Sequence, residues 1–155
     1  MPHVTLIYPF IPHHDFGQET LGGLTQACLG VEPFEVTLAR FKDFRHGKEN
    51  HTIWLAPEPG DELDLLQGQL AEAFPEYDDV RSFPAGFTPH LSVGQIKGDD
   101  VCAQFLQSLQ VSWSPITFVA DRISLIWRNE PPDDVFRVYK ETMLGSGDVV
   151  DPEGQ

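Results

Sequence analysis

The sequence has little cysteine and no long apolar run. Its two cysteines are too few for the disulfide framework of a secreted protein, and no apolar segment approaches the length that crosses a bilayer. The first residues also lack the basic segment and apolar core of a secretion signal. These absences predict a cytoplasmic protein without a membrane partner. Cys28 and Cys102 fall on apolar faces of expected helices, so we expect both thiols to be buried and reduced.

Positive charge is scarce as well. Ten lysines and arginines stand against 24 acidic residues, and the formal net charge of −14 predicts a surface that repels long nucleic acids. A small anionic substrate in one local pocket is compatible with this charge, and we expect a monomer with such a substrate as its partner. Four basic residues cluster, and we call them the basic stretch: Arg40, Lys42, Arg45 and Lys48. They indicate either a substrate-facing patch or a solvated hairpin tip with nothing bound.

Hydrophobic periodicity changes between two and about 3.6 residues several times along the chain. These changes predict strands and helices without any break in composition that would mark a linker. The expected helices are 21–28, 63–74 and 101–109. The expected strands are 4–8, 34–38, 52–56, one that begins near residue 90, 116–119, 123–127 and 135–139. We therefore predict one α+β domain over residues 1–144, followed by a disordered tail at 145–155.

The two halves of the chain share an order of elements. Each has a Pro-His strand, a helix that carries a cysteine, and two strands of which the second holds an Ile-Trp pair, Ile53-Trp54 or Ile126-Trp127. This repeat predicts two pseudo-symmetric lobes, about 1–60 and 61–144, whose Pro-His strands face each other across a central cleft. A strand and a helix precede the second Pro-His strand and have no counterpart before the first. We therefore expect the N-terminal strand and helix of the repeat to be missing.

One short motif occurs in both expected Pro-His strands. Its two copies are Pro2-His3-Val4-Thr5 and Pro89-His90-Leu91-Ser92. Because successive strand side chains point to opposite faces, each strand presents one imidazole and one hydroxyl on the same face, about 6 to 7 Å apart. Hydroxyls can donate hydrogen bonds to the non-bridging oxygens of a phosphate, and two imidazoles can serve as general base and general acid near neutral pH. The paired motif therefore indicates phosphoryl chemistry.

The inference depends on the pair, because a single copy would describe only a polar strand face. The other histidines carry less weight. His13 and His14 fall in an expected loop, His46 and His51 lie beside the basic stretch, and none has a ligand spacing typical of zinc. We therefore expect no metal and no cofactor.

His3-Val4-Thr5-Leu6 and His90-Leu91-Ser92-Val93 resemble the paired His-x-Thr/Ser-x signatures of the 2H phosphoesterases, the superfamily of 2′-5′ RNA ligase-like proteins and cyclic nucleotide phosphodiesterases. The resemblance extends to the flanking residues and the order of elements, and so covers nearly the whole chain. It implies a bilobal α+β fold, with antiparallel sheets lining a central cleft and helices outside. It also implies metal-independent chemistry on RNA-derived or nucleotide phosphodiesters. By the same resemblance, His3 and His90 are the acid/base pair, and Thr5 and Ser92 bind the phosphate.

The resemblance leaves three activities open. We favour hydrolysis of a small cyclic phosphodiester, such as a 2′,3′-cyclic nucleotide or RNA end. Ligation of 2′-5′ RNA ends is the reverse chemistry on the same site, and a catalytically idle nucleotide- or RNA-end-binding module is the rival. Further substrate contacts are candidates among five residues that flank the motifs or end a strand: Tyr8, Phe10, Phe87, Trp127 and Arg128. One of them could stack on a base or hold a phosphate, while core packing is the expected role of most.

Overall fold

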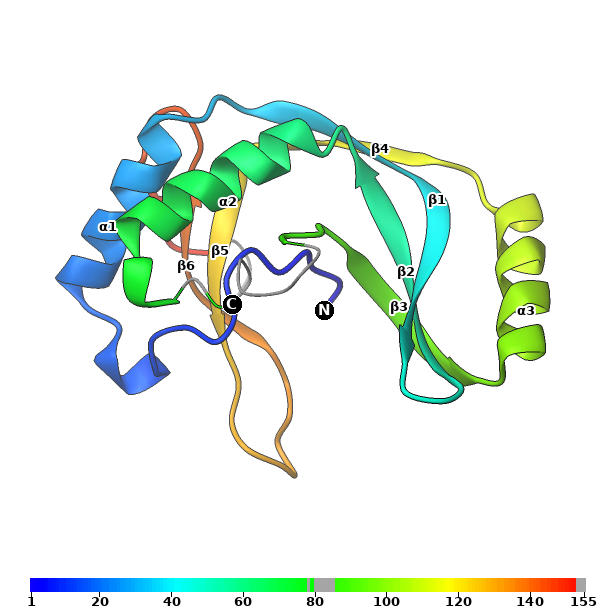
Figure 1. Cartoon of the computed structure of the whole chain (residues 1–155). Helices are drawn as coiled ribbons and strands as arrows, with labels where there is room; N and C mark the ends of the chain where they lie inside the picture. Colours follow the sequence, from blue (N-terminus) through cyan, green and yellow to red (C-terminus); the bar gives the residue numbers. More distant parts are fainter. Residues whose placement is uncertain (78, 80–85, 153–155) are drawn as a thin grey trace.

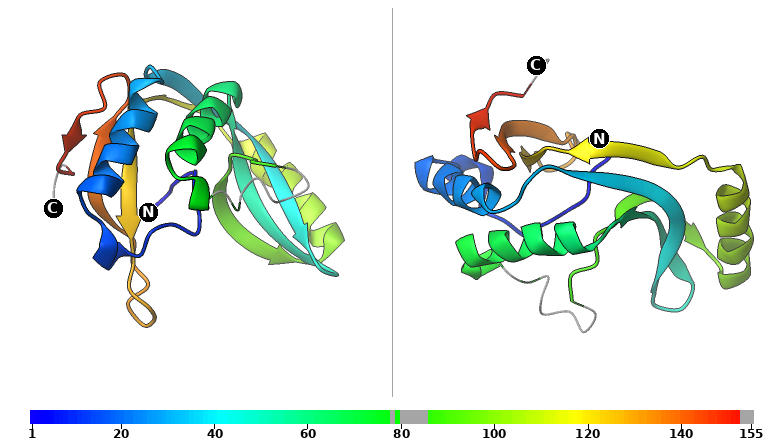
Figure 2. Two further views of the ribbon diagram at one scale, coloured as in Figure 1. Left: turned by 60° about the vertical axis from the view of Figure 1, so that its left-hand side comes forward. Right: turned by 90° about the horizontal axis from the view of Figure 1, so that it is seen from above.

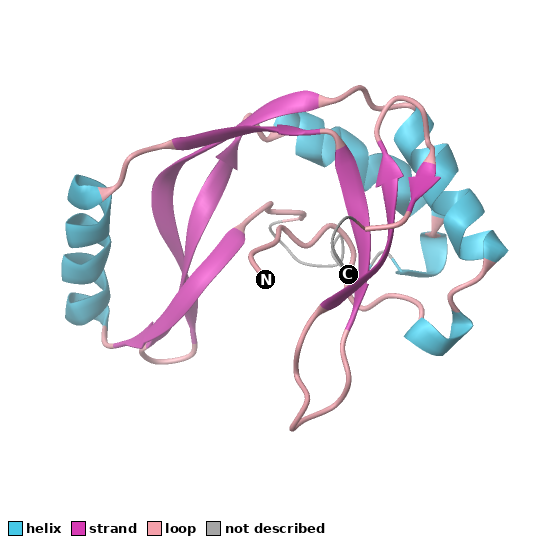
Figure 3. Ribbon diagram, turned by 180° about the vertical axis from the view of Figure 1, so that it is seen from behind, coloured by secondary structure: helices cyan, strands magenta, loops and turns pink. Residues whose placement is uncertain are grey.

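The computed structural model describes residues 1–77, 79 and 86–152. Within these residues the strands form two antiparallel sheets, sheet A in the order β3-β2-β1-β4 and sheet B in the order β5-β6-β7. The two sheets stand as the limbs of an arch, and β1 and β4 run across its top (Figure 1). The N-terminal segment lies beneath the arch, as the view from behind also shows (Figure 3).

Sheet A contains β1 (Phe34–His46), β2 (Asn50–Glu58), β3 (Leu91–Lys97) and β4 (Ile116–Ala120). Sheet B contains β5 (Arg122–Trp127), β6 (Arg137–Met143) and β7 (Val149–Val150). The helices are α1 (Gln18–Leu29), α2 (Asp61–Ala73) and α3 (Asp99–Ser112), with short 3-10 turns η1 (His13–Asp15) and η2 (Pro75–Tyr77). In the part of the chain that the structure describes, every helix is too short or too polar to span a lipid bilayer.

Helices α1 and α2 pack against each other beside sheet B (Figure 2). Apolar residues recur at helical spacing on both helices, and the stripes they form are buried, with Leu24 and Cys28 on α1 and Leu66 and Leu70 on α2. These stripes meet Ile123 of β5 in one hydrophobic cluster. Burial of this shared cluster holds the two helices and sheet B together as one body of the arch.

Helix α3 covers the outer face of sheet A, where it closes a defect in the strand pairing. The register of β1 against β2 shifts at Ala39, which leaves backbone groups of β1 without strand partners. The Gln110 amide supplies both kinds of partner, accepting from the Phe41 N–H and donating to the Ala39 carbonyl, each at 3.0 Å. The Trp113 indole N–H donates to the Leu38 carbonyl at 2.8 Å. Side chains of α3 and of the residue after it therefore provide hydrogen-bond partners for the backbone groups that the bulge in β1 leaves unpaired.

The predicted α+β class with antiparallel sheets is confirmed, and most expected elements lie close to their predicted ranges. The strand predicted at 4–8 was wrong, because only Val4 forms an isolated bridge. Pro2 and Pro9 flank this segment and have no N–H to donate to a ladder. The strand predicted at 135–139 begins later and runs further, as β6. Both predicted cysteine assignments hold, since the two thiols are free and buried.

The lobes of the molecule do not follow the halves of the sequence. Sheet A combines β1 and β2 from the first half with β3 and β4 from the second, and α1 and α2 pack together beside sheet B. The predicted division into residues 1–60 and 61–144 was therefore wrong. Hydrophobic periodicity identifies strands, but it does not say which strands share a sheet.

The disordered tail predicted from residue 145 was wrong for residues 145–152. Strand β7 pairs with β6, and the Gly145 N–H donates to the carbonyls of Cys28 and Val31 at 3.0 and 2.8 Å. The Thr25 hydroxyl donates to the Gly147 carbonyl at 2.9 Å. These bonds tie the segment to α1, which the polar and glycine-rich composition did not indicate. Residues 153–155 lie outside the described residues.

Candidate active site

The two copies of the Pro-His motif meet beneath the arch. The N-terminal segment and β3 touch through an antiparallel bridge between Val4 and Leu91. In such a pair the residues on either side of the bridge lie opposite one another, so Thr5 is placed beside His90 and His3 beside Ser92. The bridge therefore brings the two copies of the motif side by side.

The two imidazoles are oriented by the same kind of hydrogen bond. His3 Nδ1 lies 3.0 Å from the Met1 carbonyl oxygen, and His90 Nδ1 lies 2.8 Å from the Thr88 carbonyl oxygen. In each case the acceptor belongs to the residue two positions earlier. A carbonyl oxygen can only accept, so Nδ1 carries the proton and Nε2 of the neutral ring keeps its lone pair. Each imidazole is therefore prepared to exchange a proton through Nε2.

Aromatic side chains on the inner face of sheet A surround His90. Its ring centroid lies 5.0 Å from that of Phe44 and 5.9 Å from that of Trp54, and the Phe44 and Trp54 rings stack at 4.7 Å. The Lys42 ammonium lies 5.5 Å from the centre of the Trp54 ring. The sequence had indicated Trp54 only as part of a repeat and Lys42 only as part of the basic stretch. The structure adds both to the surroundings of His90.

His3 has its own aromatic and cationic neighbours. The ring of Phe136 meets it at 4.9 Å, and the Arg128 guanidinium carbon lies 4.7 Å from the centre of the Phe136 ring. Arg128 also forms an ion pair with Asp134 at 2.7 Å. Sheet B and the loop after β5 therefore supply a cation on the His3 side, as Lys42 does on the His90 side.

A cavity of about 600 Å³ runs along the N-terminal segment. His3 and Thr5 line it from that segment, together with Ser124 of β5 and Arg128. Of the second motif, Leu91 lines this cavity, whereas His90 and Ser92 are not among the described lining residues. The cavity therefore opens on the first motif and reaches the second only at Leu91, the bridge residue.

Three of the remaining predicted contact residues, Tyr8, Phe10 and Trp127, line this cavity, and each also has neighbours of its own. Tyr8 lines the cavity and is 69% exposed. Phe10 packs edge-on against the rings of Phe74 and Tyr77, which is a core role. Trp127 stacks on His13 with 4.4 Å between ring centroids, and Phe87 is partly buried. A substrate role for each of these residues stays a prediction.

Two of the four residues of the basic stretch form ion pairs with carboxylates. Arg40 pairs with Glu58, and Arg45 pairs with Asp99 at 2.8 Å. The Arg45 guanidinium also donates to the Lys48 carbonyl at 2.9 Å. The solvated hairpin therefore explains these residues, and Lys42 is the member of the stretch that lies toward His90.

The family follows from a comparison with known proteins. The family model described as the 2′-5′ RNA ligase superfamily matches residues 1–132. The chain belongs to the 2′-5′ RNA ligase superfamily. It is also similar to a protein of Geobacillus kaustophilus (strain HTA426) whose name provisionally assigns it as a phosphoesterase, with 24% identity over 153 residues that cover 96% of this chain and 82% of the relative. Membership in the 2′-5′ RNA ligase superfamily confirms the predicted 2H phosphoesterase resemblance.

Proposed function

We propose that the protein hydrolyses a small 2′,3′-cyclic phosphodiester at a nucleotide or RNA end, with His3 and His90 as the acid/base pair. The observation that carries the proposal is that both imidazoles donate a hydrogen bond from Nδ1 to a backbone carbonyl. The bridge between Val4 and Leu91 brings the two rings onto neighbouring segments. Two proton-transfer groups in one site are what an in-line displacement at phosphorus requires.

The chemistry needs one neutral and one protonated imidazole. The neutral ring takes a proton from water through Nε2, and the resulting hydroxide attacks phosphorus opposite one ribose oxygen. The bond from phosphorus to that oxygen breaks, and the imidazolium of the other histidine gives its Nε2 proton to the leaving alkoxide. The product is a ribose phosphomonoester. The hydroxyls of Thr5 and Ser92 donate hydrogen bonds to the non-bridging oxygens, where negative charge is concentrated.

The surroundings favour a small substrate with a localised negative charge. Lys42 supplies positive charge on the His90 side of the motif pair, within a chain of net charge −14, and Arg128 on the His3 side is paired with Asp134. Tyr8 offers an exposed ring at the cavity on which a base can stack. A substrate with one phosphate and one base can therefore be bound at this site, whereas the acidic surface would repel a long nucleic acid.

The proposal is tested by turnover of a panel of nucleoside 2′,3′-cyclic phosphates by the whole chain. We expect His3→Ala and His90→Ala each to lower kcat by about 10²–10⁴-fold, since each removes one proton-transfer group. His14→Ala is the matched control, because this histidine is exposed and lies outside the motif pair. Wild-type turnover should rise and then fall with pH.

The same assay separates the alternatives. Turnover that survives in both the His3 and His90 variants would overturn the proposal. Cyclic nucleotide binding in a calorimeter without any product would select a binding module in place of an enzyme. Joining of 2′-5′ RNA ends with little hydrolysis would select ligation as the main activity.

A further inference from the structure

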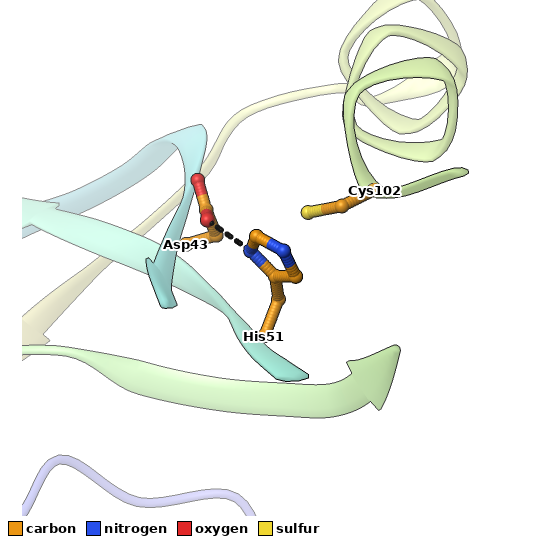
Figure 4. A group of neighbouring side chains, drawn as sticks. All are labelled: Asp43, His51 and Cys102. Carbon is orange, nitrogen blue, oxygen red and sulfur yellow. Dashed lines mark hydrogen bonds and ion pairs between the residues drawn. The ribbon is translucent and has the colours of Figure 1, made fainter. Parts of the chain in front are cut away.

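A second group of reactive side chains meets on the outer side of sheet A. Asp43 on β1, His51 on β2 and Cys102 on α3 point toward one another between the sheet and the helix (Figure 4). Along β1 and β2 these residues alternate with Lys42, Phe44 and the other side chains that face His90, so they lie on the opposite face of the sheet. The group is therefore separate from the paired histidine motifs.

The three side chains can offer their ligand atoms to one point. A carboxylate oxygen of Asp43, a ring nitrogen of His51 and the sulfur of Cys102 all lie within 4.8 Å of one another. His51 is 6% exposed and Cys102 is 2% exposed, while the Asp43 side chain is 32% exposed. Two of the ligands are thus buried, and Asp43 lies on the side that solvent can reach.

A further carboxylate orients the imidazole. His51 Nδ1 lies 2.7 Å from Asp43 Oδ2, and its Nε2 lies 2.9 Å from Asp99 Oδ1. Asp99 is itself held by Arg45 at 2.8 Å. Metal-binding histidines usually donate the N–H of the other ring nitrogen to a carboxylate, which fixes the tautomer and the ring orientation. With Nδ1 directed to a metal, Asp99 fills this supporting position.

We propose that Asp43, His51 and Cys102 bind one Zn²⁺ ion, with water in the fourth position on the Asp43 side. Thiolate, imidazole and carboxylate together form a ligand set that zinc accepts in tetrahedral geometry. Binding displaces two protons, one from His51 Nδ1 and one from the Cys102 thiol. Asp43 Oδ2 and His51 Nδ1 separate slightly to admit the ion between them.

The charges of the group balance in both states. Without a metal, two carboxylates face the two nitrogens of His51, so both nitrogens donate and the ring is an imidazolium. Zn²⁺ replaces the Nδ1 proton of His51 and the thiol proton of Cys102, so the summed charge of the three ligand side chains, Asp99, Arg45 and any bound ion stays at zero.

Bound zinc would fasten α3 to the hairpin of β1 and β2. In this role the ion connects elements of the fold, and its ligands lie on the face of sheet A opposite His90. Chelation should therefore lower the stability of the zinc-loaded protein without removing the proton-transfer groups of the proposed reaction. Metal binding and stability therefore test the zinc proposal, and turnover of cyclic nucleotides tests the phosphodiesterase proposal independently.

The test is a Co²⁺ titration of the whole untagged chain, followed by displacement with Zn²⁺. We expect one equivalent of Co²⁺ to produce a thiolate-to-cobalt absorption band and one equivalent of Zn²⁺ to abolish it. Cys102→Ser should lose the band, whereas Cys28→Ser, which changes the other buried thiol, should keep it. Asp99→Asn should weaken Zn²⁺ binding about 10- to 100-fold, and His46→Gln should leave it unchanged.

A second measurement covers variants that fold poorly. Zn²⁺ should raise the Tm of the wild type and of Cys28→Ser, with a stoichiometry of one ion per chain by equilibrium dialysis. The absence of a thiolate band together with the absence of stoichiometric binding in the wild type would overturn the proposal. So would a band that persists in Cys102→Ser, because the cobalt would then be bound elsewhere.

Discussion

Two backbone carbonyls define what the histidines of the paired motif can do. The Met1 and Thr88 carbonyls accept hydrogen bonds from Nδ1 of His3 and His90, so in both neutral rings Nε2 carries the lone pair. The sequence shows the two histidines and the hydroxyls that follow them, because these are carried by a local pattern. It does not show the ring tautomers, which depend on where the carbonyl two residues earlier points.

Lys42 is the residue whose substitution best separates binding from chemistry. We expect Lys42→Ala to lower kcat/KM about fivefold, mainly through KM, since an exposed ion pair with a substrate phosphate contributes ~1 kcal/mol. Steady-state kinetics with a 2′,3′-cyclic nucleotide measure this effect. Lys48→Ala removes the same charge from the hairpin tip and serves as the control. Equal losses in the two variants would assign the effect to net charge rather than to the position beside Trp54.

At the scale of elements, the sequence predicts best where one face of a helix or strand is buried. The apolar stripes of α1 and α2 gave nearly correct ranges because packing and periodicity agree there. The strand predicted at 4–8 was wrong. Its side-chain pattern suits a strand, but in the structure this segment has only the single bridge at Val4. The sequence analysis did not identify the proposed zinc ligands, for a different reason. Asp43, His51 and Cys102 come from three elements, and no spacing connects them before the sheet and α3 are assembled.

Alanine substitutions at two adjacent glycines of α1 should change the stability of the protein in different ways. A Cβ on Gly22 would meet nothing within 4 Å, whereas one on Gly23 would lie 2.5 Å from the Phe74 ring. We expect Gly22→Ala to raise the free energy of unfolding by about 0.5–1 kcal/mol, because alanine favours the helix. Gly23→Ala should be about 1–3 kcal/mol less stable than Gly22→Ala, since a buried ring must move. Urea denaturation compares the two, and equal stability would show that Phe74 yields at little cost.

At the scale of the whole molecule, connectivity was the least predictable feature. The repeated order of elements suggested two lobes that follow each other along the chain. In the structure β3 and β4 complete the sheet that β1 and β2 begin, so sheet A draws on both halves, and α1 from the first half packs beside sheet B. Which strands become neighbours depends on long-range packing, and hydrophobic periodicity carries no information about it.

The acidic surface predicts a preference for short substrates. With a net charge of −14, each phosphate added beyond the reactive end should be repelled. We expect kcat/KM to fall as oligonucleotides with a 2′,3′-cyclic end are lengthened. This loss should shrink between roughly 10 mM and 150 mM salt, since the Debye length falls from about 30 Å to about 8 Å. A kcat/KM that instead rises with oligonucleotide length would indicate a basic path that the described surface does not offer.

The bulge in β1 has a consequence for what the opposite face of sheet A presents. Gln110 and Trp113 fit the backbone of β1 in one alignment, since their partners are the unpaired groups around Ala39. If β1 slid along β2 by two residues, these side chains would face groups already bonded in the ladder. The contacts of Gln110 and Trp113 thus fix the register of β1 against β2. This register places Phe44 against His90 and Lys42 over Trp54, and a shifted register would place other residues of β1 there.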